Sequence, residues 1–277
     1  MKNPLLWIIL LVIAAGAAWY LSVRLDQAEV EQAVVTPGPV ASLELPEPEQ
    51  FPVEDIQVPA PAPVEVPDAE PEAPAPPPEA PLPILSESDP EVLESAAMLS
   101  PPLEALLIPE FVLSRIVATV DALDSARVAP PMRPMTSMPG RFTVLEANDQ
   151  AVISPENAER YAPYVAIIAE LDTTQLVALY VRYYPLLQEA YLGLGKGDAR
   201  FNDRVVEILD LLMATPEPVG LIEVVQNEAV WEFAVPELEA LPVGQKAMLR
   251  LSPDDRRIVK AQMRALRDAL AGGPPAP

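Results

Sequence analysis

The chain has 277 residues, 36 of them proline, and its 41 acidic against 18 basic residues give a formal net charge of −23. It contains no cysteine and no histidine, which excludes disulfides, thiolate or imidazole metal sites, cysteine nucleophiles and Ser-His triads. The charge is uneven: residues 1–24 hold two bases and no acid, residues 25–114 hold nineteen acids and no base, and residues 115–277 hold 22 acids and 16 bases. We therefore expect an apolar leader, an acidic spacer and a nearly balanced globular region.

The leader contains nineteen consecutive residues without a charge, LLWIILLVIAAGAAWYLSV at 5–23. A helix of this length spans roughly 28 Å at about 1.5 Å per residue, which is enough to cross a hydrocarbon core. Ala15-Gly16-Ala17 resembles a signal-peptide cleavage site, but the apolar run continues through Trp19 and Tyr20. We expect residues 1–25 to be an uncleaved single-pass anchor; the alternative is a cleaved signal peptide, and both export the remainder.

The orientation of the anchor follows from the bases around it. Lys2 and Arg24 nearly balance under the positive-inside rule, but the segment after Arg24 contains no further base until Arg115. We therefore expect the N-terminus inside and the C-terminal domain outside the cytoplasm.

The spacer, residues 26–87, is dominated by proline, with sixteen prolines between Pro37 and Pro83 among Glu, Ala and Val. Proline cannot donate to a helix or sheet ladder and like charges repel, so we expect a disordered tether that samples polyproline II. The alternative is a docking strip for proline-binding domains, although Pro76-Pro77-Pro78 lacks flanking basic residues.

The globular region shows repeated helix-start patterns, in which a capping residue precedes a proline at Ser88-Asp89-Pro90, Ser154-Pro155 and Ser252-Pro253. We predict helices at 90–99, 110–123, 155–170, 173–192, 201–214 and 253–270, with short helical turns at 103–107 and 236–250. Residues 141–145 and 151–153 predict a small β-hairpin, and 221–225 a further strand. Residues 88–270 should thus form a compact, mainly α-helical domain with one core, followed by a disordered tail at 271–277.

Four motifs occur in order along this domain: PGRF at 139–142, RYAPYV at 160–165, YPLLQEAY at 184–191 and FNDR at 201–204. Together with the anchor and spacer, they resemble a family of bacterial single-pass envelope proteins whose C-terminal domain is catalogued only as a domain of unknown function. The resemblance covers roughly residues 85–270. It implies an inner (cytoplasmic) membrane location and domain limits, and it implies no catalytic residue.

Motifs for phosphate binding and serine nucleophiles fail on inspection. Gly193-Leu194-Gly195-Lys196-Gly197 has glycine where a P-loop needs Ser or Thr, and it follows a predicted helix, so we interpret it as a helix stop. Neither Gly-x-Ser-x-Gly nor Ser-x-x-Lys occurs. A carboxylate pair could still perform acid–base chemistry, but nothing in the sequence singles one out.

Six of the seven tyrosines lie within residues 161–191, and Tyr180, Tyr184 and Tyr191 share one helix face. Their rings either complete the core with phenols at its rim, or form a groove that stacks on a sugar or an extended peptide. In the second case the hydrogen-bonding residues of a partner-binding site would be Gln188, Glu189, Asn202, Asp203 and Arg204.

The last predicted helix carries a cationic face beside an apolar stripe, formed by Arg256, Lys260, Arg264 and Arg267. We expect a solvated face opposite the core. The alternative is a surface for lipid headgroups, a cell-wall polymer or the chain's own acidic spacer.

These observations predict a membrane-anchored, envelope-facing binding or scaffolding protein. We expect no enzymatic activity, catalytic residue, cofactor or metal. The expected partners are the lipid bilayer, through residues 5–23, and an envelope protein or polymer, but no nucleic acid. The alternative function is a carboxylate-dependent cell-envelope hydrolase or transferase.

Overall fold

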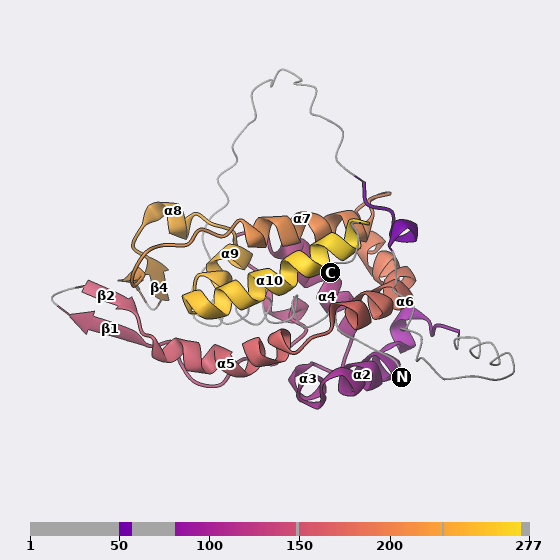
Figure 1. The fold of residues 1–277 in the computed structure, drawn as a ribbon, viewed down its shortest axis with the longest axis horizontal. Helices are drawn as coiled ribbons and strands as arrows, with labels where there is room; N and C mark the ends of the chain where they lie inside the picture. Colours follow the sequence, from indigo (N-terminus) through magenta and orange to yellow (C-terminus); the bar gives the residue numbers. More distant parts are fainter. Residues whose placement is uncertain (1–49, 57–80, 148–149, 229, 273–277) are drawn as a thin grey trace, which may run out of the picture.

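A computed structural model describes residues 50–56, 81–147, 150–228 and 230–272 of the chain (Figure 1). The predicted anchor at 1–25, most of the spacer and the end of the tail lie outside the described residues. No single helix in the described ranges has both the length and the apolar composition to cross a membrane. The predicted span at 5–23 is not among those ranges.

The described part is mainly helical, as predicted. Its α-helices are α2 (Asp89–Leu99), α3 (Pro101–Leu106), α4 (Val112–Ala122), α5 (Glu156–Ala169), α6 (Thr173–Leu192), α7 (Phe201–Met213), α8 (Pro236–Glu239), α9 (Val243–Met248) and α10 (Pro253–Leu270). Short 3₁₀ turns are η1 (Val53–Asp55), η2 (Leu85–Glu87) and η3 (Pro130–Met132).

Polar side chains fix several helix starts. The Asp172 carboxylate accepts the backbone N–H groups of Thr174 and Gln175 at the start of α6, and Ser252 Oγ accepts the Asp255 N–H at the start of α10. At α4 the cap comes from another helix, because the Asp89 carboxylate of α2 accepts the N–H groups of Phe111 and Val112. These bonds satisfy donors that have no partner within the helix.

The core lies where α10 and α4 meet the central helices. α10 packs against α5, α6 and α7, and α4 packs against α6 and α7; Figure 1 shows α10 lying between α7 and α5. On α4 the buried residues include Leu113, Ile116, Val117 and Val120, spaced so that one helix face is apolar. This packing brings the ends of α6, α7 and α10 together.

A four-stranded antiparallel sheet, in the order β1-β2-β3-β4, forms beside the helices. Its strands are β1 (Val144–Ala147), β2 (Gln150–Ile153), β3 (Glu223–Asn227) and β4 (Val230–Phe233). The predicted hairpin and the third strand are present with shifted ends, and β4 was not predicted. A second, smaller core of Ile153, Val224, Phe233 and Leu249 joins the sheet to the helices.

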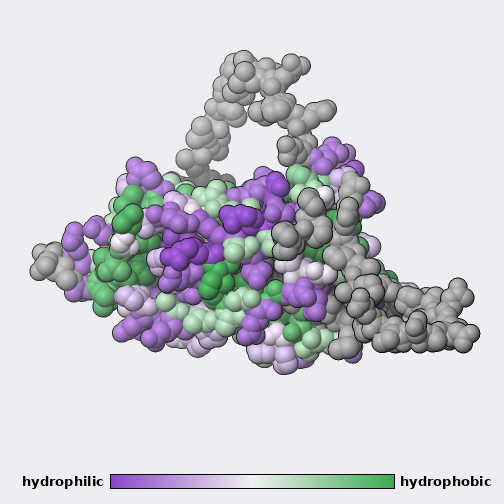
Figure 2. Space-filling view, viewed as in Figure 1, coloured by the Kyte–Doolittle hydropathy of each residue, from purple (hydrophilic) through white to green (hydrophobic). Residues whose placement is uncertain are grey.

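The strand end of the molecule also exposes apolar side chains. Figure 2 shows hydrophobic residues gathered there, beside more hydrophilic residues over α7 and α10. The exposed large hydrophobic residues of this part are Leu145, Val219, Leu221, Val225 and Val235.

Two pieces of the predicted spacer pack against the domain. In residues 50–56, Ile56 is buried in the main core, and Phe51 and Val53 pack partly against it. In residues 81–87, Leu82 and Leu85 are partly buried and pack against the same core. These residues of the spacer predicted at 26–87 are thus placed against the domain, and the disorder expected of the spacer stays a prediction. The physical reason for this placement is that both pieces contain large apolar side chains that can be buried, whereas most of the spacer consists of Pro, Glu, Ala and Val.

Candidate functional site

The candidate site lies where the C-terminal half of α6, the start of α7 and the end of α10 meet. Asn202, at the start of α7, is completely buried. Its Oδ1 accepts a 2.9 Å hydrogen bond from the Tyr180 hydroxyl of α6, and its Nδ2 donates to the Leu270 carbonyl of α10 at 3.2 Å. One amide side chain therefore connects the three helices.

The predicted tyrosine face points largely into the core. Tyr180 is 0% exposed and Tyr191 is 5% exposed, whereas Tyr184 is partly exposed. The Tyr180 ring packs against Tyr184 with centroids 5.6 Å apart, and the Tyr191 ring packs against Phe201 at 5.4 Å. Burial raises the pKa of Tyr180 well above its ordinary value. Tyr180 and Tyr191 thus belong to the core, as the first interpretation expects.

Gln188 organises the connection between α6 and α7. Its Oε1 accepts bonds from the Tyr184 hydroxyl at 3.0 Å and from the Phe201 N–H at 2.7 Å, and its Nε2 donates to the Ala199 carbonyl at 2.8 Å. Glu189, by contrast, is exposed. The glycine-rich segment ends α6, with Gly195 at φ 80° in the left-handed region that suits glycine, so it is the helix stop that the sequence predicted.

Asp203 and Arg204, which follow Asn202, act in different directions. Asp203 faces the spacer segment. Arg204 forms ion pairs with the carboxylates of Asp121 at 3.3 Å, Asp124 at 2.7 Å and Glu207 at 2.8 Å. Burial by itself would lower the pKa of the Arg204 guanidinium, but the hydrogen bonds and charges of its carboxylate partners raise it overall. Arg204 therefore fastens α7 to the end of α4.

The spacer residues Gln50–Ile56 occupy this end of the bundle, which the sequence did not predict. The Phe51 N–H donates to Asp203 Oδ1 at 2.6 Å, and the Phe51 carbonyl accepts from Asn202 Nδ2 at 2.8 Å. The Arg267 guanidinium of α10 lies 5.8 Å from the centre of the Phe51 ring. One feature of the sequence could have indicated this contact. Phe51 is the one aromatic residue between Tyr20 and Phe111, so its ring is the one that this stretch of the chain could bury.

A cavity of about 700 Å³ opens beside the docked Phe51. The residues lining it include Tyr191, Asp198, Arg200, Asp203, Glu207 and Asp210. It runs along the exposed side of α7, so the site is larger than the segment that occupies part of it.

Two cations of α10 are not where the sequence placed them. Arg256 is 4% exposed and Lys260 is 9% exposed. Both predictions for this helix, a solvated face and a surface for an anionic partner, are therefore wrong for these two residues. Arg256 donates to the Met248 carbonyl at 3.1 Å and to the Leu251 carbonyl at 3.2 Å, near the end of α9. The physical reason is that carbonyls at a helix end lack partners within the helix, and a buried cation can supply the donors.

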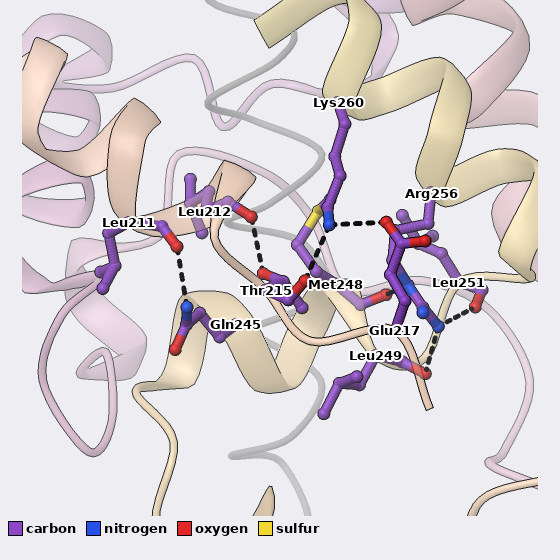
Figure 3. A network of polar contacts seen from close by, with 10 residues as sticks. All are labelled: Leu211, Leu212, Thr215, Glu217, Gln245, Met248, Leu249, Leu251, Arg256 and Lys260. Atoms are coloured by element: carbon purple, nitrogen blue, oxygen red, sulfur yellow. Dashed lines mark hydrogen bonds and ion pairs between the residues drawn. The ribbon is translucent and has the colours of Figure 1, made fainter. Parts of the chain in front are cut away.

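Lys260 makes the corresponding contact after α7 (Figure 3). Its Nζ donates to the Thr215 carbonyl at 2.7 Å and pairs with the Glu217 carboxylate at 2.8 Å. Figure 3 shows the Lys260 side chain pointing toward both groups. Of the other two cations, Arg264 is exposed, as predicted, and Arg267 pairs with Asp210 at 3.1 Å. Arg267 also contacts the spacer, through the ring of Phe51.

No group of three or more carboxylates that could hold a metal ion occurs in the described ranges. The candidate site consists of amide, carboxylate and guanidinium groups around the docked ring of Phe51.

Comparison with known proteins identifies a family. A family model described as "Protein of unknown function (DUF3014)" matches residues 112–267, which is more than half of the chain. This confirms the resemblance that the four motifs indicated. The match begins at α4 and ends within α10, so it includes Asn202, Asp203 and Arg267 but not the docked segment. No curated protein and no solved structure matches the chain.

Proposed function

The chain belongs to this family, whose description assigns no activity, and on that premise we propose that it is a membrane-anchored, envelope-facing protein that binds a peptide segment without acting on it chemically. The binding site is the junction of α6, α7 and α10. The anchor at 5–23, the inner-membrane location and the domain outside the cytoplasm are part of the proposal, supported by the sequence pattern.

The observation that carries the proposal is the pair of hydrogen bonds around Phe51. Asp203 accepts its backbone N–H and Asn202 donates to its backbone carbonyl. Main-chain bonds of this kind hold a peptide regardless of its side chains, and an adjacent side-chain contact then supplies specificity. Here that contact is the Phe51 ring beside the Arg267 guanidinium.

The dimensions of the site support a peptide ligand. The cavity of about 700 Å³ beside Phe51 lies within the ~300–1,000 Å³ typical of ligand sites. Because it extends beyond the docked residues, it leaves room for a ligand longer than the segment in place. Its mixture of carboxylates and Arg200 suits polar peptide groups more than a purely apolar molecule.

The ion pairs at the site support binding over catalysis. Arg204 is engaged by Asp121 and Asp124, and Arg267 is paired with Asp210. Asp203 accepts a peptide N–H at 2.6 Å. These groups hold different segments of the protein in fixed positions relative to one another. Fixed contacts of this kind suit recognition.

The test is direct binding of a labelled peptide with the sequence of residues 47–58, EPEQFPVEDIQV, to the full-length chain in detergent. The chain should carry Phe51→Ala, which removes the ring contact of the segment already in the site and so weakens its hold. We expect saturable binding by fluorescence anisotropy, and none for a scrambled peptide. Adding Asp203→Ala should weaken binding about 5- to 70-fold, because a charge-assisted hydrogen bond is worth roughly 1–2.5 kcal/mol.

The matched control is Asp268→Ala, which removes an exposed carboxylate from α10. It should leave the affinity unchanged. Equal binding of the native and scrambled peptides, or an Asp203 variant that binds as well as the Asp268 variant, would refute the proposed site.

A further inference from the structure

Residues 50–56 fill the site that we assign to a peptide, although they belong to the same chain. We infer that this segment is an exchangeable internal occupant, which we call the latch. It competes with an incoming peptide and, when displaced, lengthens the tether between membrane and domain. The inference rests on the proposed function.

The latch is attached by few contacts compared with the helices beneath it. Phe51, Pro52 and Val53 are only partly buried and Glu54 is exposed, while Ile56 is 8% exposed. The domain keeps its own bonds when the latch leaves. Asn202 still receives the Tyr180 hydroxyl and still donates to the Leu270 carbonyl, and the bond lost to Phe51 can be replaced by water at an open site.

The competition can be estimated from chain length. The latch is joined to Pro81 of the domain by the 24 residues 57–80. A linker that is long enough to join the two sites gives an effective concentration on the order of 1 mM. For a segment with an intrinsic Kd on the order of 100 μM, the latch is closed about ten times more often than open, and an external peptide binds about ten-fold more weakly.

Release of the latch changes the length of the tether. With the latch closed, the 24 residues 26–49 separate the predicted anchor from the domain; with it open, the 55 residues 26–80 do so. At about 3.1 Å per residue for the polyproline II conformation that the sequence predicts, the maximum reach rises from ~75 Å to ~170 Å. Peptide binding at the junction would therefore allow the domain to move farther from the membrane.

The first experiment compares the affinity of the labelled 47–58 peptide for three full-length chains. These are the wild type, Phe51→Ala, and a chain whose residues 50–56 are replaced by seven Gly and Ser residues. Both latch variants should bind about ten-fold more tightly than the wild type, and Val219→Ala, at a fully exposed apolar position, should bind like the wild type.

The outcomes separate the two proposals. Binding to the latch variants that is no tighter than binding to the wild type would overturn the latch while leaving the peptide site intact. Absence of binding to both latch variants would overturn the proposed function and the latch with it.

A second experiment observes the latch directly. The chain has no cysteine, so spin labels can be placed uniquely at Glu54→Cys on the latch and Arg264→Cys on α10, both exposed positions. The distance distribution should be narrow without ligand and should become longer and broader with saturating unlabelled peptide. A distribution that stays narrow while the peptide is bound would overturn the inference.

Discussion

The hydroxyl of Tyr180 donates to Asn202 Oδ1 at 2.9 Å in a completely buried position, and the amide nitrogen of Asn202 then reaches the Phe51 carbonyl at 2.8 Å. The first bond joins two core helices, and the second holds the spacer segment. A single side chain thus belongs both to the interior and to the candidate site. Changes at Asn202 should therefore alter stability and peptide binding together, while changes at Asp203 should alter binding alone.

Replacing Asn202 by alanine should destabilise the protein strongly. The change removes the acceptor of the Tyr180 hydroxyl and a donor to the Leu270 carbonyl, and each buried polar group left without a partner costs about 1–3 kcal/mol. We expect a loss of ~2–4 kcal/mol in the free energy of unfolding, measured from urea denaturation. The control is Asn227→Ala, at an exposed residue of β3, which should change stability by less than ~0.5 kcal/mol. Equal effects of the two variants would contradict the described role of Asn202.

The tyrosines of α6 should differ in what their removal costs. Tyr180 is 0% exposed and Tyr184 only partly buried, so Tyr180→Ala should cost ~3–5 kcal/mol and Tyr184→Ala clearly less. Tyr180→Phe keeps the ring and leaves Asn202 Oδ1 without the hydroxyl, for an expected loss of ~1–2 kcal/mol. Urea midpoints of the three variants would test this order, and a Tyr184→Ala loss as large as that of Tyr180→Ala would place both rings equally in the core.

Much of the helical part of the fold was predictable because its signals are local. Capping residues and prolines marked the starts of α5 and α10, and the glycine-rich segment marked the end of α6. β4 was missed because its turn carries Glu228 at φ 53°, and a glutamate in the left-handed region gives no turn signal of the Asn-Gly type.

The candidate site was predictable only in part. Asn202 and Asp203 do meet at one end of α6, because the loop after Leu192 turns the chain back on itself. Their ligand was not predictable, since Phe51 lies some 150 residues away and its contacts are tertiary. The burial of Lys260 was also hidden, because a cation beside an apolar stripe normally faces solvent. Its partners, the carbonyl of Thr215 and the carboxylate of Glu217, are recognised only in the folded structure.

Stability should fall at high pH because of the buried tyrosines. Burial raises the pKa values of Tyr161, Tyr180 and Tyr183 above the ordinary value of 10.0. Above pH ~10 the unfolded chain releases these protons while the folded chain retains them, so the unfolded state binds fewer protons and the free energy of unfolding decreases as pH rises. We expect urea midpoints to decline from pH 9 to 11.

The Tyr180→Phe variant isolates this effect from the titration of lysines, which occurs in the same range. Because phenylalanine has no proton to lose, the decline of the variant between pH 9 and 11 should be shallower than that of the wild type. Parallel declines would show that Tyr180 does not contribute to the alkaline loss.

The last prediction concerns the buried cation of α10. Lys260→Met keeps a long apolar side chain but removes the donor to the Thr215 carbonyl and the partner of Glu217. A buried carbonyl left without its charged donor should cost ~1–3 kcal/mol, measured by urea denaturation, whereas Arg264→Met at the exposed neighbour should cost less than ~0.5 kcal/mol.

The Lys260→Met variant should also change the acid dependence of stability. The hydrogen bond and charge of Lys260 lower the pKa of Glu217 below its ordinary 4.5, so the folded state loses this stabilisation as pH falls below 4.5 and Glu217 takes up its proton. Between pH 5 and 3 the wild type should therefore lose more stability than Lys260→Met does. A variant as stable as the wild type at pH 7, with the same acid profile, would show that this contact contributes nothing to the fold.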